Sequence, residues 1–149
     1  MTAVTDKLFG NKAIQVAYTF ANYDPSGVVE FRINKPSAEK FNVGDQLGAH
    51  VWGDMGYNTL CAVFSDENGA EVVEPLGAVN FHGWKYITKK LSALEAGKAY
   101  QFVGYRLRKD SDTEAPFGLS GTMKFDNVLK ASTSADSYTH LTLPTKLEV

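Results

Sequence analysis

The chain has 149 residues, with 15 Lys and Arg against 17 Asp and Glu, so its formal net charge is −2. This length suits one domain with its own core, and the near balance of charge argues against a nucleic-acid binder, which usually carries a basic excess. Hydrophobic residues make up 44% of the chain, yet no apolar run is long enough to span a bilayer, and the first ten residues lack the pattern of a signal peptide. Cys61 is the single cysteine, which excludes an internal disulfide framework and a thiolate metal cluster.

Apolar and polar residues alternate along most of the chain with a period of two, whereas helical periodicity is rare. The segments with this strand-like alternation are, in chain order, 13–20, 28–34, 46–54, 59–73, 84–91, 100–108 and 121–129. Within 59–73, Asn68-Gly69 supplies the positive φ angles of a hairpin turn, and 37–41 and 92–97 are each long enough for one helical turn. About seven or eight short strands with turn residues between them predict an all-β fold, an antiparallel β-sandwich of the jelly-roll kind.

Residues 137–145, "SYTHLTLPT", do not look like a continuation of the domain before them. They resemble one reading frame of a transposase-type sequencing adapter, a recurring contaminant of metagenomic protein sequences. The alternative is a short terminal strand, because Leu141 and Leu143 alternate with polar residues. We expect a single domain over 1–135 and a non-native tail over 136–149, in which His140 has no evolved role.

Few residue patterns in the sequence point to catalysis. The "GLSG" segment (118–121) lacks the second spacer of a nucleophile elbow and precedes a strand rather than a helix. His50 and His82 are the candidate bases, and neither has the spacing of a metal-ligand pair. The sequence does not exclude a pair of carboxylates for glycoside hydrolysis, since the two residues need only lie close together in the folded protein. We therefore predict a protein that is not an enzyme, and the alternative is a small jelly-roll lyase or hydrolase with a cleft lined by His50.

Aromatic residues on several strands are the stronger functional signal. Sugar rings stack on aromatic planes through their C–H faces, so a sandwich with aromatics on one sheet face predicts a glycan platform. Large aromatics also dominate cores, and for Trp84 we favour core packing, because Gly83 would let the chain bend and turn the indole inward. Trp52 is the better ligand candidate, since Gly48 and His50 share its face while the alternate residues of this strand look like core. The predicted ligand contacts are Trp52, Tyr57, His50, Arg106 and Trp84.

Charged residues on the late strands leave two questions open. Two positive groups, one that includes Lys85 and one that includes Arg106, would meet an acidic polysaccharide or, as is more usual for such charge runs, form a solvated face. Asp126, in the middle of the last strand, is a candidate ligand for a structural calcium ion together with backbone carbonyls near the N-terminus. The same carboxylate would equally suit hydrogen bonds to the backbone N–H groups of a turn.

Four segments together resemble a known kind of domain: "HVWGD" (50–54), "DENG" (66–69), "FHGWK" (81–85) and "GTMKFD" (121–126). Over about residues 11–131 the chain is similar to the galactose-binding-like jelly-roll domains, of the carbohydrate-binding-module type, that are appended to bacterial cell-surface and secreted carbohydrate enzymes such as phosphodiester glycosidases. The first segment departs from the pattern, because those domains carry extra residues between the tryptophan and the glycine.

This resemblance implies a non-catalytic module that binds a polysaccharide, located outside the cell or at its surface, with a catalytic domain of the same parent chain as its partner. It also implies a calcium ligand at a position similar to Asp126. Neither a nucleic-acid partner nor membrane insertion is expected. The alternative from another class is a structural spacer or adhesion domain without a glycan ligand.

Overall fold

The computed structural model describes residues 2–4, 13–20, 27–33, 38–109, 120–131, 139–141 and 147–148. These residues form strands joined by turns and contain no helix, so the helical turns expected at 37–41 and 92–97 are absent from the described part of both segments. Consequently, none of the residues that the structure describes belongs to a helix that is long and apolar enough to cross a membrane.

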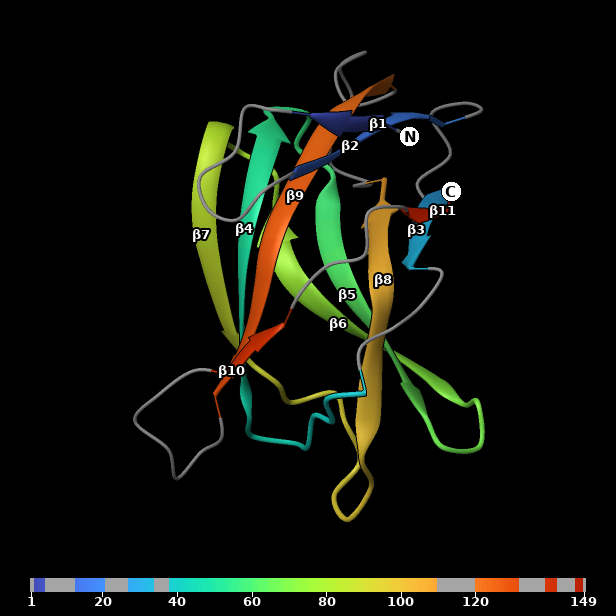
Figure 1. Cartoon of the computed structure of the whole chain (residues 1–149). Coiled ribbons are helices and arrows are strands. Elements are labelled where there is room, and N and C mark those ends of the chain that lie inside the picture. The colour runs from blue at the N-terminus through green and yellow to red at the C-terminus, as the bar shows by residue number, and fades with distance from the viewer. Residues whose placement is uncertain are drawn as a thin grey trace.

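The strands form two antiparallel sheets that pack face to face (Figure 1). Their bounds are β1 Thr2–Val4, β2 Ala13–Thr19, β3 Val28–Ile33, β4 Gln46–Asp54, β5 Thr59–Asp66, β6 Glu71–Ala78, β7 His82–Lys90, β8 Tyr100–Arg108, β9 Ser120–Ala131, β10 Thr139–Leu141 and β11 Leu147–Glu148. Sheet A has the order β1-β2-β9-β4-β7, with β10 also paired to β9, and sheet B has the order β11-β3-β8-β5-β6.

The all-β sandwich predicted from the alternation is confirmed. Each predicted strand matches an observed strand to within a few residues, and 59–73 forms the β5–β6 hairpin. In that hairpin Gly69 takes the expected positive φ, 84°, whereas Asn68 does not. Asp66 Oδ1 accepts hydrogen bonds from the backbone N–H groups of Asn68 and Ala70. Local hydrogen bonding by the side chain and one glycine therefore close the turn.

The hydrophobic core lies between the two sheets and consists of the inward residues of each alternating strand. Leu47, Ala49 and Val51 of β4 are at most 1% exposed. Across the core, Tyr105 of β8 stacks on Phe125 of β9 with ring centroids 4.1 Å apart. The residues of β4 and β9 that alternate with this core therefore belong to the opposite, outer face of sheet A.

The end of the chain adds two short strands to the sandwich. Thr139–Leu141 pairs with β9, and Leu147–Glu148 pairs with β3. The expectation that 136–149 is a non-native tail concerns the origin of these residues, and it stays a prediction.

Candidate functional site

The outer face of sheet A carries aromatic rings from two neighbouring strands. His50 and Trp52 of β4 alternate with the core residues of that strand, so they project outward. Across the β4–β7 ladder, His50 lies opposite Tyr86, and Trp52 lies opposite Trp84. Residues directly opposite each other in a ladder share a face, so two pairs of rings stand side by side on this surface.

Two contacts between these rings join β4 to β7. The rings of His50 and Tyr86 have centroids 4.6 Å apart at an angle of 37°. The ring of His82 meets Trp52 edge-on, with centroids 5.0 Å apart. We call the set His50, Trp52, His82, Trp84 and Tyr86 the aromatic face. Tyr86 is 40% exposed and both tryptophans are half-buried, so solvent reaches this surface.

Strand β9 borders the aromatic face with two charged residues. Lys124 lies opposite Trp52, and its Nζ is 4.8 Å from the centroid of the indole ring, within the range of a cation–π contact. Asp126 lies opposite His50 and is only 4% exposed. A bulge after Ala49 shifts the register, which keeps Asp126 beside His50 while Val128 stays in the core.

Two glycines give the aromatic face its local geometry. A Cβ atom added to Gly48 would lie 2.2 Å from the Tyr86 hydroxyl oxygen and 2.8 Å from its Cζ. The Tyr86 ring therefore extends across the backbone of β4 at a position where no side chain stands. Gly83, just before Trp84, has a φ of 105°, a conformation that L residues rarely adopt. The bend that was predicted to turn Trp84 inward is not observed, because Gly83 pairs with Gly53 within the β4–β7 ladder and Trp84 lies outside the hydrophobic core cluster.

The loop between β4 and β5 lies at the end of the aromatic face where β4 finishes and β7 begins. Asp54 fixes its start, because its carboxylate accepts hydrogen bonds from the Tyr18 hydroxyl at 2.6 Å and the Gly56 N–H at 2.9 Å. Burial raises the pKa of Tyr18, and the hydrogen bond to Asp54 raises it further. Tyr57 follows in this loop, 44% exposed and with a positive φ of 62°. Its N–H donates to the Val79 carbonyl at 2.9 Å, so the loop holds Tyr57 at the rim of the sheet.

Arg106 belongs to the other sheet. It lies opposite Glu30 in the β3–β8 ladder and donates hydrogen bonds to the Glu30 carboxylate, which also accepts from Arg32 at 3.0 Å. Burial raises the pKa of Glu30, but the hydrogen bonds from Arg106 and Arg32 outweigh it and leave the pKa below its usual value. The structure therefore brings together His50, Trp52 and Trp84, places Tyr57 at their rim, and separates Arg106 from them by the core.

The position of Trp84 differs from the one that the sequence predicted. It was expected inside the sandwich, yet it is absent from the hydrophobic core cluster and stands opposite Trp52 on the outer face. The reason is the register of β7, in which Ile87 packs against the core and the residues of opposite parity project outward. Tyr86, His82 and Lys124 were not among the ligand contacts predicted from the sequence, in which His82 was named only as a candidate base. The alternation within "HGWKY" places 82, 84 and 86 on one face and is the signal for two of them.

The calcium prediction at Asp126 is not decided by the described residues. No group of three or more His, Cys, Asp or Glu side chains that could hold a metal ion occurs among them. The carbonyl partners were expected near the N-terminus, and residues 5–12 lie outside the described part of the chain. Asp126 as a calcium ligand stays a prediction.

The aromatic face offers stacking surfaces flanked by hydrogen-bonding groups. The exposed phenol ring of Tyr86 and the half-buried indole rings can bind the apolar face of a cyclic ligand. The exposed His82 and the half-buried Lys124 supply hydrogen-bonding groups beside those rings, whereas His50 and Asp126 are buried beneath the surface. Comparison of the chain with protein families, with curated proteins and with solved structures gives no match.

Proposed function

We propose that this protein is a non-catalytic carbohydrate-binding module that binds a polysaccharide on the aromatic face of sheet A. The single observation that carries the proposal is the cross-strand pair Trp52–Trp84 on the outer side of the sandwich. Large aromatics in a sandwich of this size normally fill the core, which here is built without either tryptophan. Two adjacent indoles on a solvent-facing sheet suit the stacking of sugar rings.

The surroundings of the pair support a sugar ligand rather than a purely apolar one. Lys124 on β9 and the exposed His82 on β7 place hydrogen-bonding groups beside the indole of Trp52. Sugar hydroxyls need such partners, because a hydroxyl removed from water without one costs free energy. The surface is also carried by paired strands rather than by loops, so little ordering would accompany binding.

The fold supports the same proposal. The eight strands from β2 to β9 form two groups of four. Their orders are β2-β9-β4-β7 in one sheet and β3-β8-β5-β6 in the other, an arrangement that suits a jelly roll. A location outside the cell and a catalytic domain in the same parent chain follow from the family resemblance. The rival proposal is a spacer or adhesion domain that binds no glycan, and the half-burial of both indoles favours it.

Affinity electrophoresis through gels that contain neutral or acidic polysaccharides tests the proposal. Trp52→Ala and Trp84→Ala are compared with Val28→Ala, a matched control because Val28 is 48% exposed on the other sheet. We expect the unmodified protein and the control to be retarded by at least one polysaccharide, and both tryptophan variants to lose retardation while their melting curves show a folded domain. Retardation that persists in both variants, or no retardation of a folded protein by any polysaccharide, would contradict the proposal.

A further inference from the structure

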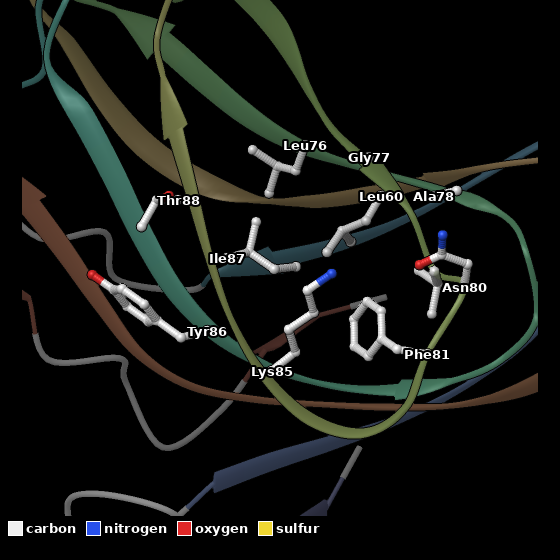
Figure 2. A pocket seen from close by; sticks show the side chains of 11 residues that line it. Leu60, Leu76, Gly77, Ala78, Asn80, Phe81, Lys85, Tyr86, Ile87 and Thr88 are labelled. Carbon is white, nitrogen blue, oxygen red and sulfur yellow. The ribbon is translucent and has the colours of Figure 1, made fainter.

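A cavity of about 420 Å³ opens between the edge strands of the two sheets, β6 and β7 (Figure 2). Its apolar lining includes Leu60 of β5, Leu76 of β6 and Ile87 of β7, and Phe81 from the β6–β7 connection stands beside them. Leu60 is only 1% exposed, and the other three pack against the hydrophobic core. The cavity is therefore an extension of the core toward solvent, of a size that small-molecule sites commonly have.

Lys85 is the only charged residue among the described residues that line the cavity. Figure 2 shows its side chain projecting among Ile87, Leu60 and Phe81, while Tyr86 points away on the other side of β7. The Lys85 Nζ lies 5.0 Å from the centroid of the Phe81 ring. Among the described residues, no carboxylate lies within ion-pair distance of this ammonium group.

Lys89, on the same side of β7, shows how a lysine at this edge can pair with a carboxylate, whereas Lys85 is exposed. Its Nζ is 3.8 Å from the carboxylate of Glu74 on β6, a side chain that is 2% exposed. That ion pair bridges the two sheets at one end of β7. Toward the other end, β6 lines the cavity with Leu76, Gly77 and Ala78, none of which carries a carboxylate. The cavity occupies the position where a second such bridge would stand.

We propose that this cavity is a second ligand site, separate from the Trp52–Trp84 pair, and that it binds a small organic carboxylate with an apolar body. The carboxylate would accept hydrogen bonds from the Lys85 ammonium group, in the way that Glu74 pairs with Lys89. The apolar body would lie against Leu60, Leu76 and Ile87 and displace water from them. The amide of Asn80, which also lines the cavity, adds a donor beside the carboxylate.

Octanoate is a suitable probe, with octan-1-ol as a neutral ligand of the same chain length. Binding of both to the full chain is followed by calorimetry and by the backbone amide NMR signals of β6 and β7. Lys85→Gln removes the charge, and Lys85→Arg keeps it. Lys90→Gln is the matched control, because Lys90 is exposed on the same strand and alternates to the outer face.

We expect octanoate to bind in a saturable manner and to shift the amide signals of β6 and β7. Its dissociation constant should rise about tenfold in Lys85→Gln and stay unchanged in Lys90→Gln and Lys85→Arg. Octan-1-ol should bind about tenfold more weakly than octanoate. Equal binding of octanoate to Lys85→Gln, equal binding of the alcohol, or no saturable binding to the folded protein would overturn the proposal. Because neither indole lines the cavity, Trp52→Ala should leave octanoate binding intact, which separates this proposal from that for the glycan.

Discussion

Gly48→Ala should displace the Tyr86 ring from the aromatic face at little cost in stability. The new Cβ would lie 2.2 Å from the Tyr86 hydroxyl oxygen, whereas non-bonded heavy atoms rest about 3.5 Å apart. The hydroxyl must therefore move by about 1.3 Å or more. Tyr86 is 40% exposed, so its side chain can move into solvent while the backbone keeps its pairing.

The expected change in the free energy of unfolding is small because two effects oppose each other. Losing the contact between Tyr86 and His50 costs about 0.5–1.5 kcal/mol, the usual value of an aromatic pair. Replacing glycine by alanine within a strand stabilises by about 0.5–1 kcal/mol. We therefore expect the free energy of unfolding in urea to change by less than about 1 kcal/mol.

Binding should respond more strongly than stability. If one stacked ring contributes about 1–2 kcal/mol, its displacement raises the dissociation constant for the retained polysaccharide about 5- to 30-fold. Calorimetric titration measures this for Gly48→Ala, for Tyr86→Ala and for the double variant, which should bind no more weakly than either single variant. Unchanged affinity in a folded Gly48→Ala protein would refute the assignment of Tyr86 to the glycan surface. A loss of stability above about 3 kcal/mol would refute the argument that the ring can move aside.

Three further predictions concern stability. Tyr105 is fully buried and its hydroxyl has no hydrogen-bond partner among the described residues, so Tyr105→Phe should raise the free energy of unfolding by about 1–2 kcal/mol in urea melts; destabilisation would mean that the hydroxyl is satisfied. Hydrogen bonds from Arg32 hold the pKa of Glu71 below its usual value. The stabilisation by this carboxylate is therefore present above its unfolded pKa, about 4.3, and lost as the pH falls through the lower folded pKa. Near neutral pH, the free energy of unfolding of Glu71→Gln should be lower than that of the unmodified protein by less than about 1 kcal/mol. This difference should vanish in acid, and a difference that persists there would contradict the assignment. If Asp126 binds calcium, the ion should raise the melting temperature of the unmodified protein above that in a chelator but leave Asp126→Asn unchanged, and equal melting with and without calcium would contradict the site.

The strands were predictable from the sequence because each is buried on one face, so apolar and polar residues alternate along it. In β4, Leu47, Ala49 and Val51 mark the core face, and the residues between them were correctly expected on the other face. The hairpin at Asn68-Gly69 was equally predictable, since its turn is decided by local conformation. These features depend on neighbours within a few residues of each other.

Strand pairing was not predictable in this way, and the composition of the candidate site depends on it. Alternation shows which residues of one strand share a face, but it does not show which strand lies beside it. Trp52 and Trp84 lie opposite each other because β4 pairs with β7, and Arg106 lies on the far sheet because β8 pairs with β3 and β5. The inward placement expected for Trp84 was wrong for the same reason, since the face of β7 is set by its register with β4.

Tryptophan fluorescence tests the central proposal most directly, because the chain has two tryptophans and both lie on the aromatic face. The emission is measured while a polysaccharide that retards the protein in gels is titrated in, with acrylamide quenching before and after saturation. We predict a saturable change in emission and protection of the indoles from acrylamide, with both effects reduced in Trp52→Ala and in Trp84→Ala. A polysaccharide that retards the protein but leaves the emission and the quenching unchanged would show that the sugar binds elsewhere and would contradict the proposed site.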